Sequence, residues 1–378
     1  MAALTEEQSL LQEQARSWAR DEAPVAKFRE MRDSGNEFGF DKATWSSIGE
    51  MGWAGIVVPE EYGGVDMGYL TFGVVLEELG RQLTASPLLA SGLVAATALV
   101  TGGTDAQKKS WLPRIADSTA IVSLALDEGP RHAPADTALK ATQIADGFKL
   151  SGQKVHVLEG MAADAFIVVA RTGGAPGEGA GLSLFLVEAC SPGVSRQRRR
   201  TADSRGYAQV LFEGVEVSSE ALMGAVDQGD AILQATLDRA RAGLAAEMLG
   251  TAAQSFDMTL DYLKNRVQFG QVIGSFQALG HRAAGLYTEM EMTRSCVEAA
   301  LQAIDAGAED IPQLCSLAKC KAGDFLHHVS NELIQIHGGI GMTDEFDAGL
   351  YLKRARALET TWGNQAFHRD RYATLVGF

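Results

Sequence analysis

The chain has 378 residues, of which 46% are hydrophobic, enough to bury the cores of two or three domains. Its formal net charge of −15 argues against binding to nucleic acids or to anionic membranes, because both attract basic surfaces. Its four cysteines have neither metal-site spacing nor the density of a disulfide framework, so we expect reduced thiols and no bound metal. The first residues carry acids where a signal peptide carries bases, and no apolar run reaches about 18 residues, so we expect a cytoplasmic protein.

Residues 1–120 are predicted to be helical. Thr5, followed by acids, is a typical N-cap, and apolar residues then recur at helical spacing at Leu4, Leu10, Leu11, Ala15 and Trp18. Two further helices are predicted at 72–83 and 90–99. Between the helices, the Gly- and Pro-containing segment 48–64 is predicted to be a connector that closes the helical layer.

The pattern changes to short β-like runs between about residues 121 and 225, and turn signals separate these runs. The runs are 121–126, 140–144, 148–150, 154–157, 166–170, 182–187 and 209–212. We therefore predict a small β domain. Within it, the basic run Arg196, Gln197, Arg198, Arg199 and Arg200 is predicted to be a solvated loop.

Helical periodicity returns from about residue 226. One long helix is predicted from the stripe Ile232, Thr236, Leu237, Ala240, Leu244, Met248, Ala252 and Phe256. Further helices are predicted at 276–306 and 313–336, and another begins near Asp344. Small residues allow these helices to pack as a bundle. The sequence therefore predicts an α+β protein with domains at 1–120, 121–225 and 226–378.

The first two of these C-terminal helices meet at a corner, residues 262–277, that is rich in polar and aromatic residues. Arg266 offers a fixed cation, Phe269 a flat apolar face and Gly270 a permissive turn. Ser275 is predicted to cap the next helix, whose first amides can then face an anion. These residue types suit a nucleotide diphosphate, and an ordinary capped corner with a solvated Arg is the alternative interpretation.

Two motifs in this region resemble the acyl-CoA dehydrogenase family. The corner contains Tyr-x3-Arg-x-Gln-Phe-Gly-x2-Ile-x2-Phe-Gln, and Gln335 begins the run Gln-Ile-His-Gly-Gly-Ile-Gly. The resemblance extends along nearly the whole chain. It implies an N-terminal helical domain, a middle β-barrel-like domain and a C-terminal four-helix bundle. It also implies FAD as cofactor, an acyl-CoA thioester as substrate and an electron-transfer flavoprotein as electron acceptor.

In this family the corner and the Gln-x-x-Gly-Gly turn reach the diphosphate and adenosine of a neighbouring subunit's FAD. The resemblance therefore implies cofactor-binding roles for Arg266, Gln268, Phe269, Phe276, Gln277, Gln335, Gly338 and Gly339. The two glycines could equally form a helix C-cap. Asp238 and Arg241 match the family's substrate-side residues, so contact with the CoA thioester is expected. For the basic run 196–200, contact with CoA phosphates or with a partner's acidic face stays open.

The residues that hold the flavin ring depart from the family pattern. Asp127-Glu128-Gly129-Pro130, followed by Ala135-Asp136, stands where the family has Thr-Glu-Pro and then Gly-Ser-Asp. His156 and Leu158 stand where the family places a Trp and a hydroxyl residue against the isoalloxazine ring. His156 could serve as a new catalytic acid or could merely fill space. Two specific ring contacts are therefore expected to be lost.

The catalytic carboxylate is also missing at both positions where the family places it. Alignment on Arg354 puts the usual Glu position at Gly363, and the alternative position on the long helix is Ala240. Neither residue can accept the α-proton of a thioester. Glu359 lies one helical turn before Gly363 and could be a displaced base, whereas a solvated carboxylate at a helix end is the simpler interpretation.

The sequence retains one half of a shared flavin site and has lost the other half. This combination is natural for a hetero-oligomer, in which two different subunits each provide one half. We therefore predict a subunit that completes the FAD site of a paralogous, Glu-carrying subunit in an α2β2 heterotetramer. This resembles the heterotetrameric acyl-CoA dehydrogenases of bacterial steroid catabolism, which makes a steroid-derived acyl group an analogy. Two alternatives remain: an active homotetramer that uses Glu359, and a flavin-poor protein that binds acyl-CoA as a scaffold.

Overall fold

The computed structural model describes residues 4–378, so the first three residues of the predicted acidic N-terminal start lie outside the described residues. The chain divides into two compact units, each built from segments distant in sequence. The first unit comprises the residues up to Phe28, Tyr69–Thr84 and Arg241–Phe378. The second comprises Arg29–Gly68 and Ala85–Ala240. The helical, β and helical order along the chain is confirmed, whereas the three domain boundaries stay a prediction.

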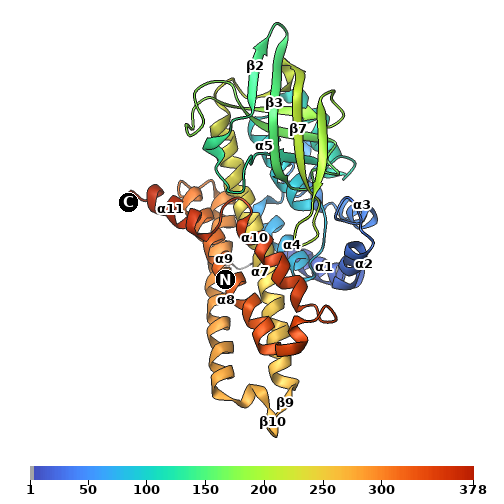
Figure 1. Cartoon of the computed structure of the whole chain (residues 1–378), viewed down its shortest axis with the longest axis vertical. Helices are drawn as coiled ribbons and strands as arrows, with labels where there is room; N and C mark the ends of the chain where they lie inside the picture. Colours follow the sequence, from blue (N-terminus) through green and yellow to red (C-terminus); the bar gives the residue numbers. More distant parts are fainter. Residues whose placement is uncertain (1–3) are drawn as a thin grey trace. The chain divides into compact units, whose positions relative to one another are not determined.

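The first unit is helical, and its long helices are visible in Figure 1. It contains α1 (Glu6–Glu22), nearly all of α4 (Gly68–Arg81), α8 (Gln277–Ala306), α9 (Ile311–His337), α10 (Ala348–Thr360), α11 (Gln365–Leu375) and the part of α7 (Gly229–Asn265) that begins at Arg241. Thr5 caps α1 in a capping box, as predicted. Leu10, predicted to share the buried stripe, is 68% exposed because successive helical residues point about 100° apart.

Close helix packing in the first unit depends on glycines. A Cβ atom at Gly250 of α7 would lie 1.8 Å from the Glu77 carbonyl oxygen of α4, and a Cβ at Gly80 would lie 2.4 Å from the Glu247 carbonyl oxygen. At the start of α4, the Asp305 carboxylate accepts hydrogen bonds from the backbone N–H groups of Tyr69 (2.6 Å) and Leu70 (2.9 Å). The predicted tight packing of this bundle is therefore achieved by backbone contact.

The second unit joins helices to a β-sheet. Its helices are the end of α2 (Val25–Asp33), α3 (Lys42–Glu50), a π-helical segment (Leu88–Ala95) that continues as α5 (Ala96–Gly102), α6 (Asp105–Ala116) and the start of α7. Single 3₁₀ turns along the whole chain are Trp53–Gly55, Glu60–Tyr62, Pro134–Asp136, Ser219–Ala221, Ile273–Ser275 and Gly338–Met342. The predicted helix at 90–99 thus spans two helical segments.

The sheet contains β1 (Val122–Ala125), β2 (Lys140–Ile144), β3 (Gly147–Val157), β4 (Ala165–Arg171), β5 (Leu182–Glu188), β6 (Val194–Arg199), β7 (Tyr207–Ser218) and β8 (Leu222–Met223). Its strand order is β6-β7-β3-β2-β4-β5-β8, and β1 pairs with β4 in parallel. Figure 1 labels β2, β3 and β7 of this sheet. In the part of the chain that the structure describes, no pairing joins β6 to β8. The predicted middle β domain is therefore confirmed, and among the described residues its sheet runs from β6 to β8 with β1 branching from β4.

The core of this sheet consists of alternating strand residues, among them Phe148 and Phe185, whose ring centroids lie 5.0 Å apart. β3 covers both of the predicted runs 148–150 and 154–157. Its pairing with β7 shifts register between Leu150 and Ser151 and again between Lys154 and Val157. Such shifts interrupt the alternation that a sequence pattern can detect.

The prediction of a loop at the basic run is wrong, because Val194–Arg199 forms the edge strand β6. Arg196 donates to the carbonyl oxygens of Met161 (3.1 Å) and Ala163 (2.8 Å), and Arg198 donates to that of Gly35 at 3.3 Å. Charged side chains on an edge strand also discourage pairing with other chains. These arginines therefore fix neighbouring turns of the second unit.

Among residues 4–378, none of the helices has both the length and the apolar character needed to cross a lipid bilayer. Within the same residues, no group of three His, Cys, Asp or Glu side chains is arranged to hold a metal ion.

Candidate functional site

The corner between α7 and α8 forms a hairpin at the far end of the two helices (Figure 1). Strands β9 (Val267–Gln268) and β10 (Gln271–Val272) pair antiparallel, and Phe269 and Gly270 form the two-residue turn with φ of 54° and 79°. Such turns favour Asn and Gly, and a bulky residue with positive φ costs about 1–3 kcal/mol. Phe269 is nevertheless 90% exposed, and its ring stands nearly perpendicular to that of Phe276, with ring centroids 6.2 Å apart.

The predicted cap at Ser275 is wrong. α8 begins at Gln277, its N-cap is Phe276 and no side chain caps it. Ser275 lies inside a 3₁₀ turn, and its hydroxyl donates to the Val272 carbonyl oxygen at 2.6 Å. An N-cap residue must stand just before the first helical residue, which Ser275 does not do.

The end of α9 lies beside this corner. Leu263, Ile273 and Ile336 form one buried cluster, against which Tyr262 and Phe276 pack. The structure thus brings together the two sequence regions predicted to hold the nucleotide. The predicted nucleotide-binding residues are all exposed except Phe276, which is half-buried; they are Arg266, Gln268, Phe269, Gln277, Gln335, Gly338 and Gly339.

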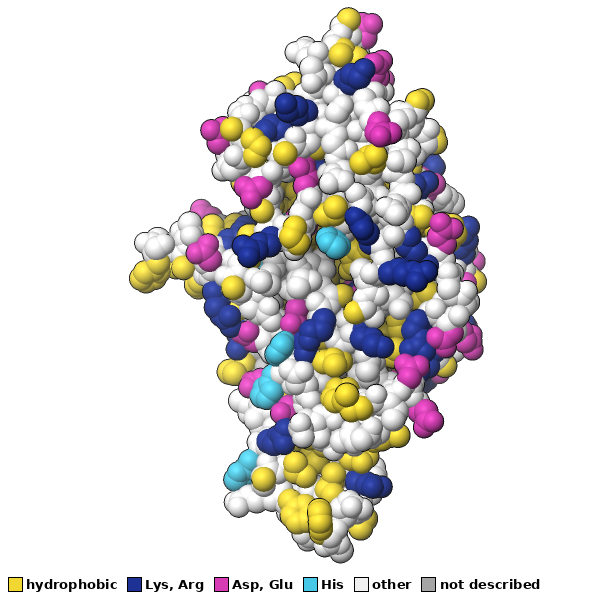
Figure 2. Space-filling view, in the orientation of Figure 1, with side chains coloured by type: hydrophobic (Ala, Val, Ile, Leu, Met, Phe, Trp, Pro, Cys, Tyr) yellow, Lys and Arg dark blue, Asp and Glu magenta, His cyan; other side chains and the backbone are white. Residues whose placement is uncertain are grey.

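The same end of the first unit carries exposed apolar side chains, and Figure 2 shows hydrophobic side chains gathered over the hairpin. Besides Phe269, the exposed residues there include Val267 (55%) and Val272 (37%), and Met342 after α9 is 76% exposed. Apolar groups clustered on a surface indicate a binding site for another molecule. Gly338 has φ 61° and ψ −133°, a conformation accessible almost only to glycine.

The region predicted to face the flavin ring lies in the second unit. His156 is exposed and has φ 53°, within the second register shift of β3, and Leu158 is half-buried and carries no hydroxyl. The residues present therefore do not reproduce the two ring contacts that FAD has in the related family. Among residues 4–378, no hydrogen bond of the His156 side chain is found.

Lys154, two residues before His156, is fully buried, and its side chain is hydrogen-bonded. Its Nζ donates to the Leu126 carbonyl oxygen at 2.8 Å and to Glu128 Oε1 at 2.7 Å. Burial lowers the pKa of Lys154 to about 8, and the Glu128 carboxylate opposes this shift. Glu128 also accepts hydrogen bonds from the N–H groups of Ala138 and Leu139, both at 2.9 Å. These contacts fix the segment before β2 and leave Glu128 committed.

A side chain at Gly363 would clash with two neighbouring side chains. A Cβ atom there would lie 2.4 Å from Phe367 Cδ1 and 2.9 Å from His368 Nε2, and the residue has φ 108°. Ala240, the other predicted base position, is fully buried and apolar. At Gly363, the predicted base position, the Phe367 ring therefore lies where a side chain would begin.

Two buried basic side chains, Lys319 and Arg241, hold the turn around Gly363. Lys319 Nζ donates to the carbonyl oxygens of Leu358 (3.1 Å), Glu359 (3.3 Å) and Gly363 (3.1 Å). Burial lowers the pKa of Lys319 to about 7, with Arg241 repelling its charge and Glu359 opposing the shift. Arg241 Nε donates to the Trp362 carbonyl oxygen at 3.2 Å. The turn is thus fixed on both sides by side chains that are 1% exposed.

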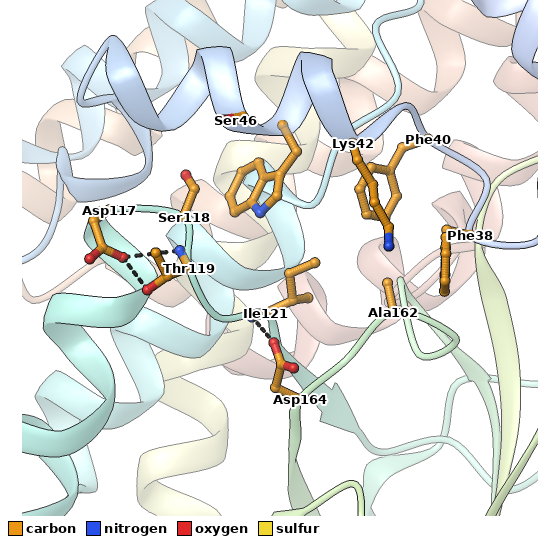
Figure 3. A pocket seen from close by; sticks show the side chains of 11 residues that line it. Phe38, Phe40, Lys42, Ser46, Asp117, Ser118, Thr119, Ile121, Ala162 and Asp164 are labelled. Carbon is orange, nitrogen blue, oxygen red and sulfur yellow. Dashed lines mark hydrogen bonds between the residues drawn. The ribbon is translucent and has the colours of Figure 1, made fainter.

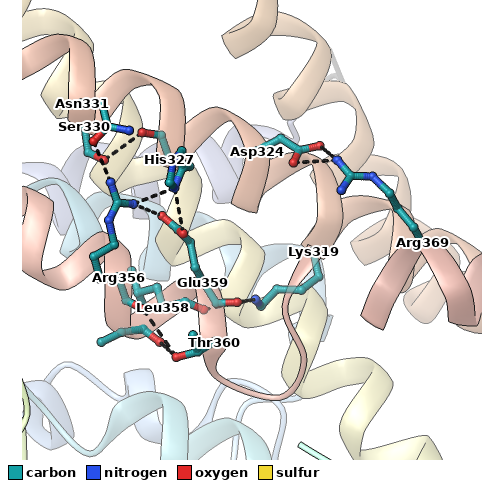
Figure 4. A network of polar contacts seen from close by, with 11 residues as sticks. Lys319, Asp324, His327, Ser330, Asn331, Arg356, Leu358, Glu359, Thr360 and Arg369 are labelled. Atoms are coloured by element: carbon teal, nitrogen blue, oxygen red, sulfur yellow. Dashed lines mark hydrogen bonds and ion pairs between the residues drawn. The ribbon is translucent and has the colours of Figure 1, made fainter. Parts of the chain in front are cut away.

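Glu359 is held by other residues. Its carboxylate bonds to Arg356 and to His327 Nδ1, the latter at 3.1 Å, and its side chain is 10% exposed. Figure 4 shows this network on one side of Glu359 and Lys319 on the other. Both oxygens of the Glu359 carboxylate are thus engaged by neighbouring side chains. The geometry therefore disfavours Glu359 as a displaced base.

The two predicted substrate-binding residues are also buried. Asp238 is 3% and Arg241 is 1% exposed. The Arg241 guanidinium lies 5.4 Å from the centre of the Phe367 ring, in addition to its bond to Trp362. Contact with the CoA thioester stays a prediction for both residues.

The second unit contains a pocket of about 340 Å³ that none of the predicted site residues line. Figure 3 shows Lys42 entering it from α3 and Asp164 on the opposite side. Asp164 accepts a hydrogen bond from the Ile121 N–H at 2.8 Å, and Asp117 accepts one from the Thr119 N–H at 3.0 Å. Both carboxylates thus fix turns, and the pocket does not supply the missing base.

Sequence reasoning missed Phe367, Lys319 and the strained turn at Phe269. Phe367 follows Gly363 by four residues, but only the fold shows that its ring takes the place of a side chain there. A lysine at an apolar position of α9 was the one signal for Lys319, since buried lysines need carbonyl or carboxylate partners.

Comparisons with known proteins agree with this layout. The family model "Acyl-CoA dehydrogenase, N-terminal domain" matches residues 5–119, and "Acyl-CoA dehydrogenase, C-terminal domain" matches residues 227–376. The chain is similar to 2-methylacyl-CoA dehydrogenase of Solanum tuberosum mitochondria, with 31% identity over 91% of this chain and 85% of that protein.

Solved structures resemble the chain over nearly its whole length. One is a variant of the Tcur3481-Tcur3483 steroid ACAD, with 31% identity, a TM-score of 0.88 and coverage of 98% of both chains. Another is the ChsE4-ChsE5 complex of Mycobacterium tuberculosis, with 26% identity, a TM-score of 0.90 and coverage of 100% of both chains. The chain belongs to the acyl-CoA dehydrogenase family, whose typical cofactor is FAD.

Proposed function

We propose that this chain is the base-lacking subunit of a heterotetrameric FAD-dependent acyl-CoA dehydrogenase. Residues 266–277 and 335–339, here named the nucleotide clasp, complete the nucleotide side of a FAD whose ring is held by a paralogous subunit. That partner carries the catalytic Glu. The reaction is the α,β-dehydrogenation of an acyl-CoA thioester, and the electrons pass to an electron-transfer flavoprotein.

The observation that carries this proposal is the closed space at Gly363. A base must stand within hydrogen-bond reach of the α-carbon's proton. Phe367 Cδ1 lies 2.4 Å from where a Cβ at 363 would be, so a side chain at this position would require the ring to move. Ala240 offers no acceptor, and Glu359 is bonded to Arg356 and His327. The chain's own residues therefore bind and orient rather than remove a proton.

The exposed nucleotide clasp supports the binding role. No hydrogen bond or ion pair of the Arg266 side chain is found among residues 4–378, so its charge is available for a diphosphate. Phe269 presents a flat ring to the surface at a conformational cost. FAD, when bound, supplies the hydride acceptor of the reaction. The clasp would hold its diphosphate and adenosine, whereas His156 and Leu158 do not fit its ring.

The heteromeric assembly and the substrate class draw on the solved relatives. One solved relative is the ChsE4-ChsE5 complex. Another is the Tcur3481-Tcur3483 steroid ACAD, whose name also contains two components. For this chain we propose a paralogous partner and a steroid-derived acyl-CoA. Identity of 26–31% supports these finer statements by analogy.

Production of the chain alone and together with its Glu-carrying paralogue tests the proposal. We expect the lone chain to bind little FAD and to show no turnover, and the pair to co-purify with bound FAD and to oxidise acyl-CoA. Full FAD occupancy and turnover by the lone chain would refute it. A colourless pair that binds CoA esters would also refute it, in favour of a scaffold.

A further inference from the structure

Three aromatic rings form a stack beneath the nucleotide clasp. The Tyr262 and His337 ring centroids lie 4.1 Å apart with an interplanar angle of 31°, and those of His337 and Phe346 lie 4.5 Å apart at 32°. Tyr262 is on α7, His337 ends α9, and Phe346 lies between the 3₁₀ turn after α9 and α10. Three separate segments are therefore joined through one imidazole.

The middle ring is fixed in place. His337 is 4% exposed, and its Nδ1 lies 2.7 Å from the Leu333 carbonyl oxygen, so Nδ1 carries the hydrogen and donates it. Burial lowers the pKa of His337, which keeps the ring neutral. A neutral, flat ring with one bonded edge resists both rotation and sliding between its two neighbours.

The Tyr262 end of the stack and its middle ring, His337, each lie next to or within one arm of the nucleotide clasp. The Arg266 N–H donates to the Tyr262 carbonyl oxygen at 2.9 Å, so the first arm begins one turn after Tyr262. His337 itself stands between Gln335 and Gly338 of the second arm. The His337 Cβ lies 3.0 Å from where a Cβ of Gly341 would be, which keeps the following turn close.

We propose that His337 is a positioning residue that sets the distance and angle between the two arms of the nucleotide clasp, 266–277 and 335–339. This inference rests on the proposed function, because it assigns the stack a role in holding FAD. An apolar side chain of similar volume would fill the same space but would let the arms slide. A flat ring is needed for alignment, and precise placement of binding groups determines affinity.

The test compares His337→Leu, which removes the flat ring, with His337→Phe, which keeps it, in the complex with the Glu-carrying paralogue. FAD and FMN affinities are measured by fluorescence titration of the FAD-stripped complex, since FMN lacks the adenosine that the clasp would hold. We expect His337→Leu to weaken FAD about fivefold and FMN hardly at all, and His337→Phe to stay within about twofold of wild type.

Phe346→Leu, at the half-buried end of the stack, provides a second variant should His337→Leu fold poorly. Thermal unfolding identifies any variant whose loss is merely structural. Wild-type FAD affinity in both Leu variants, or equal losses in His337→Phe and His337→Leu, would overturn the inference. Arg266→Ala separates the two proposals: if it also leaves FAD affinity unchanged, the proposed function fails; if it weakens FAD while the stack variants do not, only the role of His337 fails.

Discussion

The turn at Gly363 depends on two features together: residue 363 has no Cβ, and the Phe367 ring lies next to it. Gly363 needs its φ of 108°, and the Phe367 ring closes the space that a side chain would use. Arg241 and Lys319 hold the neighbouring carbonyl oxygens in place. A single substitution at this position would therefore have to displace the Phe367 ring.

Gly363→Ala is expected to reduce the free energy of unfolding by about 2–4 kcal/mol, because the Cβ clashes with Phe367 and strains the backbone. In the double variant Gly363→Ala/Phe367→Ala, the loss should be smaller than the sum of the two single losses. Urea denaturation measures both. The control is Gly349→Ala in α10, where a Cβ meets nothing within 4 Å and a small gain is expected. Additive losses would contradict this account of the turn.

Lys319 predicts a pH dependence of stability. Its pKa is lowered to about 7 in the folded chain, against the ordinary 10.5. Between these values the unfolded chain binds a proton that the folded chain has released, so the free energy of unfolding rises with pH. Lys154, with its pKa lowered to about 8, acts in the same direction.

Lys319→Met should remove one proton from this linkage and lower the slope near pH 9 by roughly 1 kcal/mol per pH unit. Urea denaturation at several pH values between 7 and 10 measures the slope. Lys109→Met, at an exposed lysine, controls for the change in net charge. An unchanged slope in Lys319→Met would show that the ammonium is not penalised by burial.

Glu359→Gln tests the remaining carboxylate near the turn. Because Arg356 and His327 already bond this group, turnover of the complex is expected to change less than about twofold. Steady-state oxidation of the acyl-CoA measures it. A loss of 100-fold or more with FAD still bound would establish Glu359 as the base and the chain as catalytic.

At the scale of the elements, a substitution in the β9–β10 hairpin can test the stability of the chain and the binding of FAD separately. Phe269 is 90% exposed with φ 54°, so Phe269→Asn should leave the lone chain's Tm unchanged or slightly higher. The same variant should weaken FAD binding by the complex several-fold, because a stacking face is lost. A lower Tm with unchanged FAD affinity would mean that Phe269 serves packing.

Sequence patterns predicted the long helices well because each buries a continuous apolar stripe. The starts of α8 and α9 lie within two residues of the prediction. β6 was not predicted because both faces of this strand carry polar side chains, of which Arg196 and Arg198 bind main-chain oxygens. β3 was divided because two register shifts break its alternation.

The candidate site was predictable only where motifs carry it. Arg266, Phe269 and Gln335 belong to motifs of residue type and spacing, and the fold brings their segments together through Leu263, Ile273 and Ile336. The closed space at Gly363 depends on where the Phe367 ring lies, which no local pattern shows. The prediction at Ser275 failed because a 3₁₀ turn moved the helix start by one residue.

At the scale of the whole molecule, family membership gives the reaction class. The division of labour between two subunits is our proposal, and it rests on which residues are retained and which are lost. In the proposed function, the chain contributes the exposed nucleotide clasp and has neither a base nor the family's ring contacts. We therefore propose that a partner supplies the ring-binding half and the proton acceptor.

Photolabelling of the complex with two FAD analogues tests this division most directly. One carries an azide on the adenine and the other an azide on the isoalloxazine ring, and mass spectrometry identifies the labelled peptides. The account predicts that the adenine analogue labels this chain within 262–279 or 331–346 and that the ring analogue labels only the paralogous subunit. Labelling of this chain near His156 by the ring analogue would contradict it.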